Sequence, residues 1–333
     1  MDNNKMYSNL TVSASPHMVT GLDTRKTMMT VLMAMVPSFL VSIYVFGPRV
    51  IALTAVCVIA SMLFEHLFCK GMKKESTVND LSSAVTGALI AFNVPANFPL
   101  WMAVIGCFVA IVIVKELFGG IGRNFANPAI TARIVLFVSF ATQMTSWPLA
   151  RGVQGATADA TTGPTPLGLI AEGNFDGMPS NKDMFLGLVG GSMGEVSALA
   201  LIIGGIFLIW KKIISPIIPA SFIGTVFVIA LIYYGANPVA GHSALDMAIF
   251  HICAGGVMLG AIFMATDYTT SPIMPLGKLI MGIGCGFFTM VIRLWAAYPE
   301  GVSFSILLMN ILTPLIDELC VKVTYGGAKN NGK

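Results

Sequence analysis

Three polar segments interrupt a largely apolar chain of 333 residues, and each carries side chains that could bind or react. The first is DATTGPT, from Asp159 to Thr165, where threonine hydroxyls stand beside Gly163. A hydroxyl that takes a covalent group needs an accessible loop and a small neighbour, and this segment fits both needs. The alternative is a simple turn, because hydroxyl residues, Gly and Pro are common in turns.

The second segment is GGIGRNFANPA, from Gly119 to Ala129. Asn127 followed by Pro128 predicts a helix start, with Asn as the cap and Pro in the first turn. The preceding glycines let the backbone turn tightly or approach a ligand closely. A helix start inside a membrane protein offers free N–H groups and a partial positive charge. The alternative is an ordinary helix cap that follows a glycine turn.

The third segment, MATDYTTSP, runs from Met264 to Pro272 and places a carboxylate at a polar break. A carboxylate buried in lipid is costly, so acidic residues within membrane spans are functional-site hypotheses by default. The candidates for an ion path are Asp80, Asp267 and Asp317. For each of them the alternative is an interfacial cap or a side chain that reaches the membrane surface.

The composition indicates the kind of structure that holds these three segments in place. Hydrophobic residues make up 56% of the chain and charged residues 11%, with a mean hydropathy of +0.81. A soluble domain carries about 25% charged residues, so a soluble enzyme, a disordered chain and a nucleic-acid binder are excluded. The six cysteines stand singly, without metal-ligand spacing, and no metal site is expected. We predict an all-α polytopic membrane protein.

The apolar runs, at about 20 residues per span, predict ten membrane helices. They lie at 27–46, 50–69, 81–96, 99–118, 128–146, 195–210, 215–234, 245–266, 277–297 and 302–322. The segment 185–194 could be a re-entrant piece. With the N-terminus inside, fourteen lysines and arginines fall in cytoplasmic loops and three in outer loops. This bias predicts that both termini are cytoplasmic and that the 147–184 loop faces out.

Ten spans divide into five plus five, and two odd-numbered halves must have opposite orientations, as in many transporters. The stretch 86–113 resembles 259–292, since each has a small-residue helix, a polar break and a second helix with a Gly-Cys pair. We therefore expect two inverted repeats. The predicted division is a cytoplasmic segment 1–26, a first repeat 27–146, an outer loop 147–184, a second repeat 185–324 and a cytoplasmic tail 325–333.

The three segments, together with YPEGVSFSILLMN (298–310), Asp317 and SPHMVTGLDTRKTMMTVLMAMVPS near the N-terminus, resemble the NqrB/RnfD family of membrane subunits. The matches run in the family's order from about residue 15 to about residue 320. The resemblance implies a urea-channel-like fold of two five-helix inverted repeats.

The resemblance also implies two flavins. DATTGPT is similar to a flavinylation signal, in which FMN is joined to a threonine through a phosphoester bond. Thr165 would carry the FMN, with Asp159 and Gly163 in the signal, although Pro164 stands where the pattern prefers Ala. The fallback sites are Thr161 and Thr162.

The glycine-rich segment would help to bind a noncovalent riboflavin through Asn124 and Asn127. Arg293 would pair with Glu300 or approach a flavin phosphate, and Arg25 would do likewise for a flavin on the inner side.

As a member of an Rnf-type complex, the chain would pass electrons from the FMN of the G subunit through its covalent FMN and riboflavin to the C subunit. Ferredoxin oxidation and NAD reduction would thereby drive Na⁺ or H⁺ outward across the bacterial cytoplasmic (inner) membrane. The expected partners are the A, B, C, E and G subunits, with G and C closest, and a flavin transferase. No catalytic side chain is expected, because flavins carry the chemistry. The alternatives are an NqrB-type quinone reductase subunit, a channel or secondary transporter, and a cofactor-free anchoring subunit.

Overall fold

The computed structural model describes residues 23–148, 162–163, 165–175, 177–187, 189–239, 241–296 and 300–324. Most of the described residues are helical, which confirms the predicted all-α membrane fold. The strands β1 (Trp147–Pro148) and β2 (Thr162–Gly163) form one short antiparallel pair. Asp159, Thr161, Pro164 and the two chain ends lie outside the described residues.

The first half of the chain folds into a series of helices that follow the predicted spans. They are α2 (Thr24–Phe46), α3 (Arg49–Gly71), η1 (Val78–Asp80), α4 (Ser82–Phe92), α5 (Leu100–Phe108), η2 (Val109–Glu116), α6 (Pro128–Ser139) and α7 (Ala141–Met144). The helix α5 continues directly into the π-helix η2.

Two short helices separate the halves, namely α8 (Pro166–Ala171) and α9 (Asn181–Leu186). The second half is again helical. Its helices are α10 (Ala198–Trp210), α11 (Ile217–Ala236), α12 (Ala244–Cys253), α13 (Val257–Leu259), η3 (Gly260–Met264), α14 (Pro275–Trp295) and α15 (Val302–Thr324).

Among the described residues, five helices are long and apolar enough to cross a membrane, namely α2, α3, α11, α14 and α15. The helices α4, α6 and α10 are apolar but shorter. The predicted continuous span 245–266 is wrong, because α12 and α13–η3 meet at a bend of 60°. The bend occurs at a glycine pair, and Gly255 has a φ of +64°, which a side chain disfavours.

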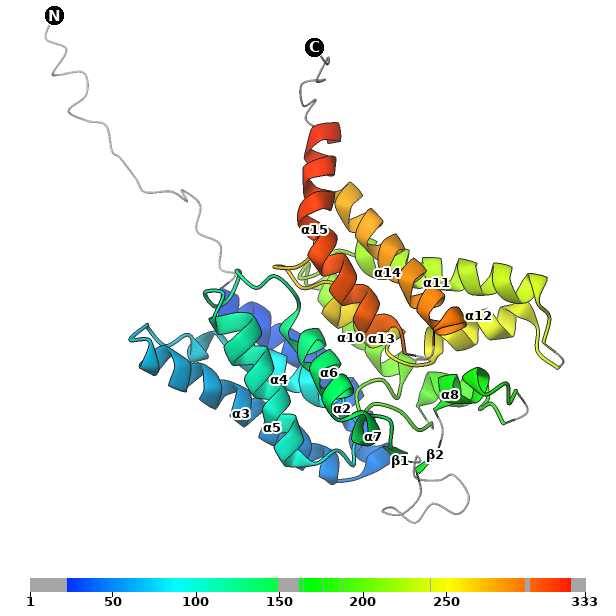
Figure 1. Ribbon diagram of the computed structural model, residues 1–333, viewed down its shortest axis with the longest axis horizontal. Coiled ribbons are helices and arrows are strands. Elements are labelled where there is room, and N and C mark those ends of the chain that lie inside the picture. The colour runs from blue at the N-terminus through cyan, green and yellow to red at the C-terminus, as the bar shows by residue number, and fades with distance from the viewer. Residues whose placement is uncertain are drawn as a thin grey trace, which may run out of the picture.

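Figure 1 shows α3 to α6 on one side of the molecule and α11, α12 and α14 on the other, and α2 of the first half packs on α10 of the second. In the first half α3 packs on α4, α5 and η2, and in the second α11 packs on α12 and α14. Glycines allow this close contact. A Cβ at Gly87 would lie 2.6 Å from the Cys57 carbonyl oxygen, and one at Gly282 would lie 2.9 Å from the Ile218 carbonyl oxygen.

The segment 189–197 enters the fold as a largely buried loop. The Met193 N–H donates to the Val94 carbonyl at 3.1 Å and the Gly194 N–H to the Phe92 carbonyl at 2.9 Å. The Ser38 hydroxyl of α2 donates to the Gly194 carbonyl at 3.0 Å. The polar break after α4 therefore gains partners from a segment nearly 100 residues away. This loop overlaps the predicted re-entrant piece.

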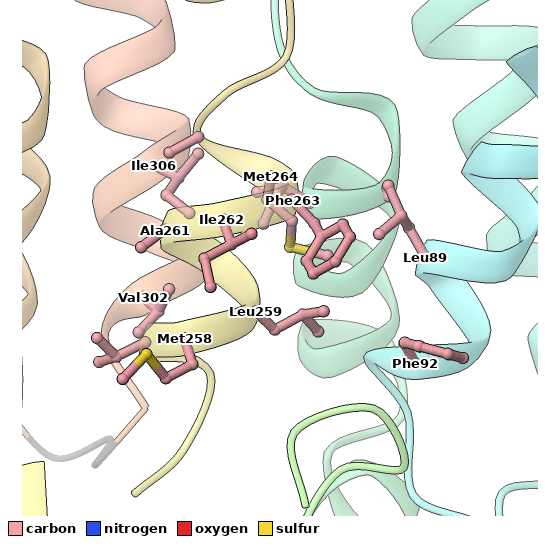
Figure 2. Packing of buried hydrophobic residues seen from close by; sticks show 14 of the residues in the cluster. Leu89, Phe92, Met258, Leu259, Ala261, Ile262, Phe263, Met264, Val302 and Ile306 are labelled. Carbon is pink, nitrogen blue, oxygen red and sulfur yellow. The ribbon is translucent and has the colours of Figure 1, made fainter. Parts of the chain in front are cut away.

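A single large apolar cluster joins both halves. Figure 2 shows Leu89 and Phe92 of α4 in this cluster with Leu259 and Phe263 of α13–η3. The broken helices of the two halves are thus held near each other by apolar packing. Their polar breaks remain at the edges of this packing, where the candidate sites lie.

Candidate functional site

A cavity of about 490 Å³ lies where the starts of α2, α4 and α6 meet the ends of η2, α10 and η3. Its size and largely apolar lining are typical of a small-molecule site, in which a few polar groups fix the orientation of the ligand. The apolar wall includes Val31, Leu89 and Phe263. The polar lining consists of Asp23, Thr24, Thr27, Ser82, Thr86, Lys115, Asn124, Asn127, Thr266, Asp267, Tyr268 and Thr269.

Asn127 caps α6 as the sequence predicts. Its Oδ1 accepts from the N–H groups of Ala129 at 3.0 Å and Ile130 at 3.3 Å, and its Nδ2 donates to the Met264 carbonyl at 3.0 Å. These bonds tie the start of α6 to the end of η3 across the two halves. An amide nitrogen has two donors, and the second N–H of Asn127 has no acceptor in the described part of the chain.

Asn124 lines the same cavity, as the predicted pairing of the two asparagines requires. Its Nδ2 donates to the Ala126 carbonyl at 3.1 Å. Gly119, Gly120 and Gly122 in the loop before it all have positive φ, of 116°, 89° and 85°. The glycines therefore form the turn that brings this loop over the cavity.

The three candidate carboxylates occupy different environments. Asp267 lines the cavity half-buried, and its Oδ2 accepts from the Thr270 hydroxyl at 3.1 Å. Burial raises the pKa of the Asp267 carboxyl, because the charged form loses hydration. The Asp80 carboxylate accepts from the Ser82 N–H at 2.8 Å, and Asp317 accepts from the Ile273 N–H at 3.1 Å. The Asp80 contact is local, whereas Asp317 joins α15 to the segment before α14, and neither residue lines the cavity.

A buried ion pair that the sequence analysis missed lies beside the cavity. The Lys115 Nζ is 2.8 Å from Glu65 Oε1 and donates to the Ser82 hydroxyl at 2.7 Å. The Thr77 hydroxyl donates to the same Glu65 oxygen at 2.6 Å. Lys115 is one of the fourteen lysines and arginines counted above in cytoplasmic loops, and that placement is wrong, because its side chain is 4% exposed. The sequence feature that could have indicated this ion pair is Glu65, an acidic residue within the apolar run 50–69.

A second buried cluster joins the halves on the other side of the apolar core. Arg133 of α6 donates through Nη1 to Asn93 Oδ1 at 2.8 Å and pairs with Glu195 Oε1 at 2.8 Å. Its Nη2 pairs with Glu300, just before α15. A buried ion pair persists where further hydrogen bonds satisfy its groups, and Asn93 and Ser192 accept such bonds from the Arg133 guanidinium.

The predicted pairing of Arg293 with Glu300 is wrong, since Glu300 binds Arg133 instead. Arg293 donates to the His251 carbonyl at 2.6 Å and to the Ala254 carbonyl at 2.8 Å. It therefore satisfies carbonyls at the end of α12, where the broken helix leaves them without intrahelical partners. Arg25 is exposed in the first turn of α2, beside lining residues of the cavity but not among them.

Thr165 is buried, with 8% of its surface exposed, rather than accessible as the sequence analysis requires for a modified hydroxyl. Its Oγ1 caps α8 by accepting from the Gly168 N–H at 3.1 Å. With Glu195, Glu300 and Gly255 it lines a small pocket of about 20 Å³. Gly163 lies two residues earlier, in β2, opposite Trp147. A group can therefore be attached to the Thr165 hydroxyl only if this packing opens, or if the packing forms after the attachment.

The comparisons with known proteins cover nearly the whole chain. Residues 11–326 match the model of the NQR2, RnfD, RnfE family. A protein of Acetobacterium woodii, named as the D subunit of a Na(+)-translocating ferredoxin:NAD(+) oxidoreductase complex, is 47% identical over 96% of both chains. A protein of Clostridium ljungdahlii, named as the D subunit of a proton-translocating complex, is 37% identical over 95% of this chain and 96% of its own. The chain therefore belongs to the NQR2, RnfD, RnfE family.

Proposed function

We propose that the chain is the D subunit of an Rnf-type complex, which couples ferredoxin oxidation and NAD reduction to the export of Na⁺ or H⁺. The observation that carries this proposal is the identity of 47% over 96% of both chains to a relative with that name. In such a complex the membrane subunits would hold some of the redox carriers. The chain itself supplies binding and spacing, while bound flavins would carry the redox chemistry.

The cavity suits riboflavin as the noncovalent cofactor. A flat ring needs an apolar wall and a few edge contacts, which Phe263 and Leu89 on one side and Asn124 on another provide. Asp267 adds an acceptor for ring or ribityl donors, and the remaining N–H of Asn127 adds a donor. The donor set and the volume of about 490 Å³ thus fit the cofactor.

Thr165 is the proposed site of covalent FMN. Figure 1 supports an outer position, since α8 begins just after Thr165 and lies away from the C-terminal end of α15. Two buried guanidinium groups, of Arg133 and Arg293, lie in the same region as Glu195 and Ala254, which line the Thr165 pocket. Arg133 is already neutralised by Glu195 and Glu300, so Arg293, which pairs with no carboxylate among the described residues, would offset the added charge of a phosphoester. Asp159 and Gly163 complete the signal for a flavin transferase.

Thr165 and the riboflavin cavity lie on opposite sides of the apolar core, so flavins at these two sites would let electrons cross it in steps. Electrons would enter from the FMN of the G subunit, pass through Thr165 and the cavity, and leave toward the C subunit. The A, B and E subunits complete the complex in the cytoplasmic membrane, with both termini of this chain inside. Asp267 is the best of the three candidates for an ion path, because it alone lines the cavity.

The apolar packing between α4 and α13–η3 argues against an open channel as the function (Figure 2). A polar ion would have to cross Leu89, Phe92, Leu259 and Phe263 at a large desolvation cost. A quinone reductase subunit of the NqrB type would bind the same flavins. The electron acceptor of the complex therefore distinguishes an NqrB-type subunit from an Rnf-type subunit.

The test uses inverted membrane vesicles from cells that contain the whole complex. Reduced ferredoxin should drive NAD reduction together with uptake of Na⁺ or H⁺, and both should be lost with Thr165→Ala. Normal ferredoxin-dependent NAD reduction with Thr165→Ala would refute the proposed flavin path. Reduction of quinone by NADH, without ferredoxin activity, would assign the complex to the alternative class.

A further inference from the structure

Lys115 occupies an unusual position for a lysine near the end of a membrane helix. It lines the cavity and is buried, although lysines at such ends ordinarily extend to the membrane surface. The helix that begins at Leu100 becomes a π-helix over Val109–Glu116, and the Leu117 N–H accordingly bonds the Val112 carbonyl at 3.0 Å. Such π-turns are rare and frequently lie at functional sites. Here the π-turn carries the lysine that lines the cavity.

The hydrogen bonds of Lys115 leave one donor unused among the described residues. An ammonium group has three N–H donors. Glu65 Oε1 at 2.8 Å and the Ser82 hydroxyl at 2.7 Å take two of them. Glu116 Oε1 lies 3.9 Å away, which is too far for a hydrogen bond. The third N–H therefore lacks an acceptor in the described chain, on a side chain that lines the cavity.

The surrounding bonds fix this ammonium rather than leaving it mobile. Glu65 is also held by the Thr77 hydroxyl at 2.6 Å, and Ser82 by the Asp80 carboxylate at 2.6 Å. Lys115 is the one cation among the described residues that line the cavity. Because burial reduces screening, the ammonium acts more strongly on a ligand at hydrogen-bond distance than it would in water, although Glu65 offsets its charge at longer range.

We infer that Lys115 donates its third N–H to an electron-rich edge of the cavity ligand and stabilises the negative charge that the ligand gains on reduction. The inference rests on the proposed flavin. Two electrons and one proton, added to the neutral ring, leave one negative charge over the ring's N1 and C2=O edge. The electrons come from the carrier on Thr165 in the complex, or from dithionite in the test. The proton comes from water.

The test compares two variants of the purified complex. Replacing Lys115 alone would strand the buried Glu65 carboxylate, so Lys115→Met is combined with Glu65→Gln, which leaves a neutral pair. Glu65→Gln alone is the matched control, because it keeps the cation and differs from the double variant only at Lys115. The noncovalent flavin is quantified after acid extraction, and its midpoint potential is measured by spectroscopic titration with dithionite.

The equilibrium constant for reduction of the bound flavin should be at least tenfold smaller in the double variant than in Glu65→Gln. The midpoint potential should therefore be lower by about 30 mV or more, since the couple transfers two electrons. Loss of flavin from the double variant, with retention in Glu65→Gln, would also support direct contact by Lys115. Equal potentials in the two variants would overturn the inference and leave the riboflavin site standing. Loss of flavin from both variants would overturn it in favour of a structural role for the ion pair. A wild-type complex without extractable flavin would refute the proposed cavity ligand, and the inference with it.

Discussion

Arg133→Met removes the cation that joins the two halves of the molecule. The Arg133 and Glu195 side chains are 7% and 3% exposed, so the substitution leaves the Glu195 carboxylate buried without its ion-pair partner. Breaking a buried pair from one side costs about 3–5 kcal/mol. That is a large part of the stability of a typical protein, about 5–15 kcal/mol. At about 2 °C per kcal/mol for a large domain, the unfolding midpoint should fall by about 6 °C or more.

The cysteines of this chain provide the assay. Cys57, Cys69, Cys107, Cys253, Cys285 and Cys320 are all free and buried. A fluorescent maleimide should therefore label the chain only as it unfolds. The complex is heated in detergent, pulsed with the dye and separated on a gel, so that labelling of this chain is measured apart from its partners.

The matched control is Arg123→Met, because Arg123 is exposed in the loop before α6. An exposed arginine contributes little to stability, so its midpoint should stay within about 1 °C of wild type, given ordinary surface effects of about 0.5 kcal/mol. Equal midpoints for Arg133→Met and Arg123→Met would refute the view that the buried cluster holds the halves together.

Three further predictions concern the buried loop and the cavity. Gly194→Ala should destabilise the chain by about 1–3 kcal/mol in the maleimide assay, because its Cβ would lie 2.4 Å from Phe92 atoms. Gly224→Ala should instead be neutral or stabilising by up to about 1 kcal/mol, since its Cβ would meet nothing within 4 Å; the opposite order would contradict the packing. Asn124→Leu should lower the extractable riboflavin of the purified complex at unchanged thermal stability, and normal riboflavin would exclude Asn124 from the site. Asp267→Asn keeps an acceptor oxygen for the flavin but removes the charge, so ion uptake into vesicles should fall at normal flavin content, and unchanged uptake would exclude Asp267 from the ion path.

Much of the fold could be predicted because apolar runs of about 20 residues have few alternatives in a membrane protein. The Asn127–Pro128 helix start was also predictable, since capping depends on neighbouring residues alone. The bend at Gly255 was not, because a glycine pair inside an apolar run is equally compatible with a continuous helix. The division into two inverted repeats stays a prediction.

The candidate sites were predictable only in part. Asn124, Asn127 and Asp267 line one cavity, although 140 residues separate Asn127 from Asp267 in the sequence. The partners of charged groups were missed, because contacts such as Arg133 with Glu195 join segments 62 residues apart. No local pattern indicates which acidic residue an arginine will choose. The burial of Thr165 likewise depends on the packing of α8 against distant segments.

The most direct test of the proposed flavin function is in-gel flavin fluorescence of the denatured chain, after expression with a flavin transferase. Wild type is compared with Thr165→Ala and with Thr162→Ala as the control for a neighbouring threonine. We predict a fluorescent band for wild type and Thr162→Ala that is absent for Thr165→Ala, which would establish covalent flavin at Thr165. A dark wild-type band, with the transferase active on another substrate, would contradict the covalent site and favour a transporter or an anchoring subunit.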